Sequence, residues 1–167
     1  MLLLISDANI LMDIEVGDLV APMFSLNCQF AVPDLLYFEE LEGDYTYMRN
    51  LGLQVRSLDP QTLGRVVQLS QRYYRMGTGR NDLSALALAE VERCSLLTGD
   101  AALRKAAEAE NVPVKGTLWL LEKMLVEERI SVTVARASLQ KMRANNRRLP
   151  WDLAEKMLTT LVQDDRA

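Results

Sequence analysis

Short apolar runs alternate with longer amphipathic stretches along most of the chain. The first run fills residues 2–6 and has no polar side chain before Ser6, a pattern typical of a strand buried on both faces. Similar runs predict further strands at residues 29–32, 54–58, 95–98 and 112–114. The stretches between them predict helices at residues 9–14, 34–43, 60–75, 82–93 and 101–110. Strands that alternate with helices favour an α/β fold, in which helices cover both faces of a parallel sheet.

The pattern changes after Gly116, where strand-like runs no longer occur. Three helices are expected there, at residues 117–127, 132–144 and 150–162. A chain of 167 residues fits one compact domain and leaves little room for a second. We therefore expect an α/β domain over residues 1–116 and a helical extension over residues 117–167 that packs on the same domain.

The composition is that of an ordinary globular chain, with 49% hydrophobic and 25% charged residues. Histidine is absent, which excludes an imidazole base and every metal site that is built on histidine. The two cysteines, Cys28 and Cys94, are too few for a four-thiolate zinc site. Their apolar neighbours predict buried free thiols in a reducing cytosol.

The N-terminal segment, MLLLISDANILMDIE, is apolar but has no basic residue, and Asp7 interrupts it early. These features argue against a signal peptide or a membrane span and predict the first strand of a cytoplasmic protein. The net charge of −4 argues against a general affinity for nucleic acid. It does not exclude a nuclease whose acidic site is neutralised by metal ions and flanked by local arginines.

Acidic residues stand where predicted strands end or helices begin. Asp7 and Asp100 follow two strands, and Asp82 opens a helix after a glycine-rich turn. Each could simply cap the next helix. However, functional groups of parallel sheets gather at the carboxyl ends of the strands, and a cluster of carboxylates there is stable only with cations. Oxygen ligands without histidine or cysteine select Mg²⁺ or Mn²⁺, ions that suit phosphodiester hydrolysis.

A further acidic pair, Glu39 and Glu40, lies on the predicted helix at residues 34–43. On a regular helical wheel the apolar side is marked by Leu35, Leu36, Phe38 and Leu41. Glu39 falls inside that arc and Glu40 at its edge, so Glu39 is the better candidate for a site. The alternative is that both carboxylates are solvated.

Four segments in order resemble the motifs of PIN-domain proteins, of the kind found as toxins in bacterial and archaeal toxin–antitoxin pairs (VapC-like). They are LLISDANILMD at the start of the chain, VPDLLYFEEL at 32–41, RNDLSALALAE at 80–90 and SLLTGDAALRKAAE at 95–108. The resemblance implies a PIN-like three-layer α/β/α sandwich with a short parallel sheet. The remaining tail resembles the helical C-terminal extension of one PIN subgroup.

The resemblance also implies a function and a site. Asp7, Glu39, Asp82 and Asp100 match the acidic metal-binding quartet of the family, and Asn9 and Thr98 match polar positions beside it. The Glu39/Glu40 doublet leaves the register of the second ligand open. The implied activity is that of an endoribonuclease that uses Mg²⁺ or Mn²⁺ to hydrolyse RNA and is inhibited by a partner antitoxin.

Several basic residues lie near the proposed site. Arg80 precedes Asp82 by two positions and could steer a phosphate, whereas Arg104 and Lys105 are explained equally well as solvated charges at a helix end. The segment RANNRR at 143–148 is a basic patch that could contact RNA, although a polar turn is the more frequent explanation.

Other functions and assemblies stay open at this point. One is a catalytically inactive PIN-fold interaction module, which an intact quartet argues against. Another is a phosphatase of the haloacid dehalogenase type, which needs a second aspartate where this chain has Asn9. A homodimer is a further expectation, because the helical stretch 34–75 carries aromatic residues that could form a surface: Tyr45, Tyr47, Tyr73 and Tyr74.

Overall fold

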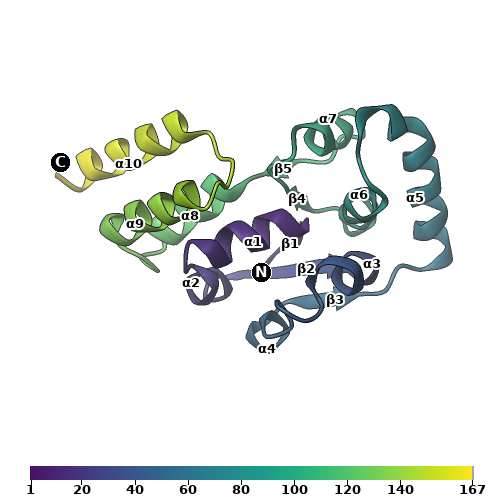
Figure 1. Ribbon diagram of the computed structural model, residues 1–167, viewed down its shortest axis with the longest axis horizontal. Helices are drawn as coiled ribbons and strands as arrows, with labels where there is room; N and C mark the ends of the chain where they lie inside the picture. The colour runs from purple at the N-terminus through teal and green to yellow at the C-terminus, as the bar shows by residue number, and fades with distance from the viewer. Residues whose placement is uncertain (167) are drawn as a thin grey trace.

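Five parallel strands form one sheet at the centre of the computed structural model, which describes the backbone of residues 1–166 and the side chains of residues 1–164 (Figure 1). The strands are β1 (Leu2–Ser6), β2 (Cys28–Pro33), β3 (Gln54–Arg56), β4 (Ser95–Leu97) and β5 (Val114–Lys115). Their order is β3-β2-β1-β4-β5, so β1 lies in the middle and pairs with β2 and β4. All strands therefore end at the same side, called here the carboxyl edge of the sheet.

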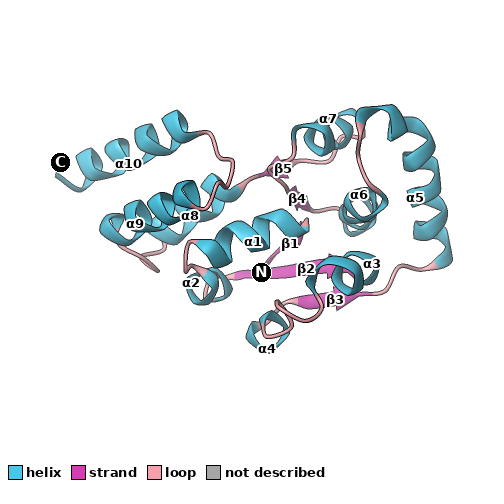
Figure 2. Cartoon of the chain, in the orientation of Figure 1, coloured by secondary structure: helices cyan, strands magenta, loops and turns pink. Residues whose placement is uncertain are grey.

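Helices cover both faces of this sheet. They are α1 (Ala8–Val16), α2 (Val20–Phe24), α3 (Asp34–Leu36), α4 (Met48–Leu51), α5 (Pro60–Tyr73), α6 (Arg80–Glu92), α7 (Ala101–Ala109), α8 (Thr117–Val126), α9 (Val132–Ala144) and α10 (Trp151–Arg166). Figure 2 shows the sheet between a group that contains α5, α6 and α7 and a group that contains α1, α8 and α9. The predicted three-layer α/β/α sandwich with a short parallel sheet is confirmed.

The centre of the core is the contact between the sheet and α6. Leu4 and Ile5 of β1 are fully buried, as are Leu96 and Leu97 of β4. In α6 the seven successive residues 83–89 are all buried, because this helix packs on the sheet and is covered by α5 on its other side. An all-round apolar helix is therefore what this position requires.

The chain departs from the expected elements in its first third. The short helices α2 and α4 were not predicted, since five and four residues give no clear periodicity and Pro22 lies within α2. The predicted helix over residues 34–43 is split into α3 and a π-helical segment, Tyr37–Leu41. Both cysteines are free, but only Cys28 is buried, and Cys94 is half-buried. Within residues 1–166, no helix has the length and apolar character needed to span a membrane.

The three C-terminal helices pack on the rest of the molecule. Helix α8 contacts α1 and α2, and α9 contacts α1 and α8. Their buried side chains, among them Leu120, Met142 and Leu158, belong to the same hydrophobic core as the strands. The division of the chain at residue 116 stays a prediction.

Candidate active site

Asp7 lies at the carboxyl edge of the sheet, between the end of β1 and the start of α1. Its side chain is fully buried. One carboxylate oxygen accepts a hydrogen bond from the backbone N–H of Ile10 at 3.0 Å, so Asp7 is the N-cap of α1. The other accepts the hydroxyl proton of Thr98 at 2.5 Å. Asp7 is therefore a helix cap, as its position predicts, and is held in one orientation by two donors.

No cationic side chain neutralises Asp7 among the ion pairs of the described residues. Burial raises the pKa of this carboxyl from 3.8 to about 7, and the negative charges of Asp82 and Asp13 add to the effect. The hydrogen bonds from Thr98 and Ile10 oppose the rise. A buried carboxylate without a counter-charge is costly, which is a common sign of a functional group.

Asp82 lies in the first turn of α6, within electrostatic reach of Asp7. The N-cap of this helix is Gly79, which makes no side-chain hydrogen bond, so Asp82 does not cap it. Burial raises the pKa of Asp82 to about 6, followed in importance by the charges of Glu40 and Asp100. Asp82 therefore has two further carboxylates within electrostatic reach.

Asp100 is connected to Asp7 through Thr98. The backbone N–H of Asp100 donates to the Thr98 hydroxyl oxygen at 3.0 Å, and this hydroxyl donates in turn to Asp7. One oxygen of Asp100 accepts from the N–H of Leu103 at 2.7 Å, which makes Asp100 the N-cap of α7. The residue itself is exposed. The loop after β4 thus orients two carboxylates at once.

The comparison with protein families decides what kind of molecule this is. The model of the PIN-domain family DUF3368 matches residues 3–163, nearly the whole chain. The chain belongs to the PIN-domain family. No curated protein sequence matches this PIN-domain chain.

Two solved structures resemble this PIN domain at low sequence identity. One is a chain of VapBC2 from Rickettsia felis, solved bound to a DNA fragment from their promoter. It is 14% identical, with a TM-score of 0.47, and the alignment covers 69% of this chain and 98% of that one. The other is a PilT N-terminus domain protein from the archaeon Sulfolobus solfataricus P2. It is also 14% identical, with a TM-score of 0.47, and the alignment covers 75% of this chain and 94% of that one.

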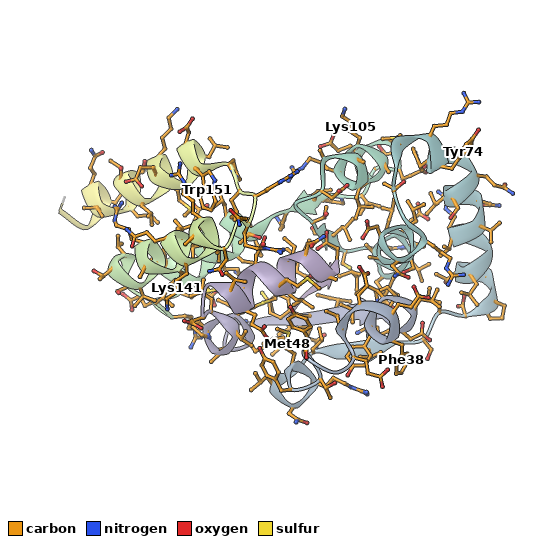
Figure 3. The ribbon with its side chains drawn as sticks, viewed as in Figure 1. Phe38, Met48, Tyr74, Lys105, Lys141 and Trp151 are labelled. Atoms are coloured by element: carbon orange, nitrogen blue, oxygen red, sulfur yellow. The ribbon has the colours of Figure 1, made fainter. Side chains whose placement is uncertain are left out.

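The structure gives Glu39 and Glu40 different environments from those that the helical wheel predicts. Glu39 is exposed and forms an ion pair with Arg80 at 3.1 Å, whereas Glu40 is the glutamate whose charge raises the pKa of Asp82. The wheel assumed a regular α-helix, but Tyr37–Leu41 is π-helical. Tyr37 is therefore buried and Phe38 is 55% exposed, on the outer surface in Figure 3. The structure thus favours Glu40 over Glu39 as the neighbour of Asp82.

The polar residues expected beside the quartet occupy different environments in the PIN domain. Thr98 is fully buried between Asp7 and Asp100, as described above. Asn9 is exposed in the first turn of α1, and its side-chain oxygen accepts from Arg147 at 3.4 Å. Arg80 begins α6, and its side chain is 63% exposed. An exposed ion pair such as Arg80–Glu39 is weak, so the guanidinium remains available to another anion.

Asp13 and Arg147 were not predicted as a pair. Asp13 is buried; one of its oxygens accepts from Arg147 Nε at 2.6 Å and the other from the Thr117 hydroxyl at 2.9 Å. Asp13 thus has a cationic partner, which Asp7 lacks among the ion pairs of the described residues, although both lie along α1. The sequence signals were two separate ones, the acidic residue six positions after Asp7 and the basic patch at 143–148 that contains Arg147. Nothing local connects them.

The carboxylates of the PIN domain fit a hard divalent cation by their chemistry. Among the described residues, no three acidic or cysteine side chains are gathered closely enough to hold a metal ion as they stand. Mg²⁺ retains several water ligands and needs only one or two direct carboxylates. Asp7 and Asp82 supply oxygen donors, have raised pKa values and form no ion pair among the described residues, so they are the donors that such an ion would use.

Proposed function

We propose that this PIN-domain protein is a metal-dependent endoribonuclease. In this proposal, Asp7, Glu40, Asp82 and Asp100 hold Mg²⁺ or Mn²⁺ at the carboxyl edge of the sheet. The observation that carries it is the buried Asp7 carboxylate, which lies within electrostatic reach of Asp82 and has no cationic partner among the described residues. The family supports the proposal, because PIN domains are generally nucleases.

The residues around this site hold its carboxylates in place and leave it open to an RNA strand. When bound, the ion activates water and stabilises the charge that develops on the phosphate. Thr98 and the N–H of Ile10 fix the Asp7 carboxylate in advance, so the site loses little entropy on binding. The N-terminal N–H groups of α1 and α7 likewise hold the Asp7 and Asp100 carboxylates, through the hydrogen bonds from Ile10 and Leu103. Asp100 and Glu40 are exposed, so a phosphodiester can approach from solvent.

Cleavage of structured RNA with Mn²⁺ tests the proposal directly. The wild-type chain should cut, and Asp7→Asn and Asp82→Asn should each lower the rate by about 100-fold or more, because each removes a charged ligand. Glu122→Gln, an exposed change on α8, is the control and should retain full activity. Equal cleavage by Asp7→Asn and wild type, or no cleavage by either, would rule out the proposal.

The two adjacent glutamates give a second, sharper expectation. Glu40→Gln should lower kcat by about tenfold or more, because Glu40 lies within reach of Asp82, while Glu39→Gln should change kcat by less than about twofold. Mn²⁺ titration calorimetry on both variants measures the same difference in affinity. The reverse order would return the ligand role to Glu39.

We further propose that the nuclease is the toxin of a type II toxin–antitoxin pair and that a partner protein inhibits it. The ordered motifs at 3–13, 32–41, 80–90 and 95–108 support this reading. Expression of the wild-type chain should then arrest growth, whereas Asp7→Asn should not. A homodimer is part of the same proposal, and gel filtration at several concentrations would show it.

The alternative is an inactive PIN-fold module that only binds other macromolecules. Such a protein has no need of a cation at Asp7. A calorimetric titration that shows no binding of Mg²⁺ or Mn²⁺ would favour it.

A further inference from the structure

Helix α9 runs antiparallel along α1 and ends near the candidate site (Figure 1). Lys141 forms an ion pair with Asp18, just beyond the end of α1. Met142 approaches Gly17 so closely that a Cβ atom there would lie 2.5 Å from its terminal methyl. The end of α9 therefore lies beside the C-terminal end of α1, and the chain that follows it is directed toward the N-terminal end of α1, where Asp7 lies.

The chain then turns sharply between α9 and α10. We call residues 145–150 the α9–α10 loop. Asn146 adopts the left-handed conformation, with φ of 60°, and the N–H of Arg147 donates back to the carbonyl of Met142 at 2.9 Å. The two ends of the loop are joined by Arg143, whose guanidinium lies over the Trp151 ring at 5.4 Å (Trp151 is labelled in Figure 3). The loop is thus short and braced.

Arg147 attaches this loop to α1. Its Nε donates to buried Asp13 at 2.6 Å, and Nη2 donates to the Asn9 carbonyl at 3.3 Å. A guanidinium held by a buried carboxylate and a backbone oxygen is largely committed to these partners. Arg147 is therefore an anchor, and the side chain that follows it is placed by that anchor.

Arg148 is the next residue, and it is exposed. It lines a cavity of about 270 Å³ together with Asn9, Gly99, Asp100 and the residues that anchor the loop. Among the described side chains, Arg148 forms no ion pair. The cavity thus has a carboxylate of the proposed metal site on one wall and an uncommitted guanidinium on another.

We propose that the α9–α10 loop is a phosphate-binding wall of the nuclease site. Arg148 binds a backbone phosphate of single-stranded RNA in this cavity, and Arg147 positions it through Asp13 and Asn9. The inference rests on the proposed ribonuclease function and adds the residue that holds the substrate beside the acidic edge.

Charge explains why such a wall is needed. The chain has a net charge of −4, and its candidate site gathers several carboxylates, so RNA is repelled unless local cations offset them. Arg80, another arginine near the site, shares its charge with Glu39 in an exposed ion pair, so this one cation does not offset all the carboxylates. A guanidinium matches the geometry of a phosphate and forms two parallel charge-assisted hydrogen bonds with it. The cavity is near the small end of the range for ligand sites, which suits one nucleotide of a strand.

The test compares Arg148→Ala with Arg129→Ala, an exposed arginine after α8, in the full chain. The probe is a fluorescently labelled single-stranded RNA oligonucleotide, titrated in EDTA so that binding is measured without cleavage. Arg148→Ala should weaken binding by about fivefold to tenfold and lower the salt slope by about 0.7, the value for one phosphate on a single strand. Arg148→Lys should lie between wild type and alanine. Arg129→Ala should bind as wild type does.

Cleavage assays separate this inference from the proposed activity. With Mn²⁺, Arg148→Ala should raise KM by about the same factor and change kcat by less than about twofold, since the residue binds the substrate outside the reacting centre. If the wild type cuts RNA and Arg148→Ala matches it in KM, affinity and salt slope, only the inference on Arg148 fails. If the wild type does not cut but binds RNA through Arg148, only the catalytic proposal fails. If the wild type neither cuts nor binds, both fail.

The positioning role of Arg147 has its own readout. Arg147→Ala should also weaken RNA binding, measured at a temperature where circular dichroism shows the variant folded. The double change with Arg148→Ala should be no weaker than Arg148→Ala alone, because both act on one contact. Additive losses would contradict positioning and assign Arg147 a separate contact with RNA.

Discussion

Asp7→Asn should give a protein that is more stable than the wild type at about pH 8 in EDTA, although it removes a proposed metal ligand. The folded pKa of Asp7 is about 7, above the unfolded value of 3.8. The fold therefore prefers the protonated carboxyl. Stability is full below the unfolded pKa, falls as the pH rises between these values, and stays low above the folded pKa. The shift corresponds to about 4 kcal/mol as an upper bound.

Asparagine removes this penalty without removing the cap. Its amide oxygen can still accept the N–H of Ile10, and asparagine caps helices as well as aspartate does. We expect the free energy of unfolding of Asp7→Asn to exceed that of the wild type by about 2–4 kcal/mol at pH 8 and to be almost equal to it at pH 4. Urea unfolding followed by circular dichroism at several pH values measures it. A saturating divalent cation should narrow the difference, because it stabilises only the wild type. A variant less stable than wild type at pH 8 would mean that the Asp7 charge is compensated.

Among the variants considered, Arg147→Ala should destabilise the fold most. We expect it to lower the free energy of unfolding by about 3 kcal/mol or more. Asp13 is buried, and without Arg147 its carboxylate has lost its only ion-pair partner among the described residues. The same ion pair connects α1 to the α9–α10 loop, and Thr117 extends the connection to α8. The substitution should therefore weaken the packing of the C-terminal helices against α1, the helix that Asp7 caps.

Matched variants separate this buried pair from ordinary surface charge. Arg136→Ala breaks an exposed ion pair with Glu155 and should cost less than about 1 kcal/mol. Adding Asp13→Asn to Arg147→Ala should recover part of the loss, because the unpaired buried charge is gone. Urea denaturation at neutral pH provides all these values. Equal costs for Arg147→Ala and Arg136→Ala would show that the Asp13 pair is not a structural anchor.

Local patterns in the sequence were sufficient to predict the sheet and most helices. The run at residues 2–6 matches β1, and the expected helix at 60–75 matches α5, which Asp59 caps by accepting the N–H of Thr62 at 2.7 Å. Such features depend on neighbours within a few residues, which is the range that periodicity and capping rules cover. The last strand was placed slightly early, at 112–114 instead of Val114–Lys115, because a two-residue strand has hardly any pattern.

The site was predictable only as far as topology places residues at the carboxyl edge. The predicted parallel order brought Asp7 and Asp100 to the same edge, where Thr98 links them. The π-helical turn at Tyr37–Leu41 was not predictable from an amphipathic pattern, so the wheel favoured Glu39. The role of Arg147 depends on a partner 134 positions away, which no local rule reaches.

The distance in sequence between Asp13 and Arg147 also has a consequence for folding during translation. While it is still being synthesised, every nascent chain that ends before residue 147 carries Asp13 without its cation, so α1 is then held less firmly in place. The helix that carries Asp7 therefore gains its last support only when translation has passed the α9–α10 loop. Ribosome-stalled chains that lack residue 147 should be cut within α1 by protease more readily than chains that contain the α9–α10 loop. The carboxylates at this edge of the sheet would then be held in their final places only after the α9–α10 loop has been added to the chain.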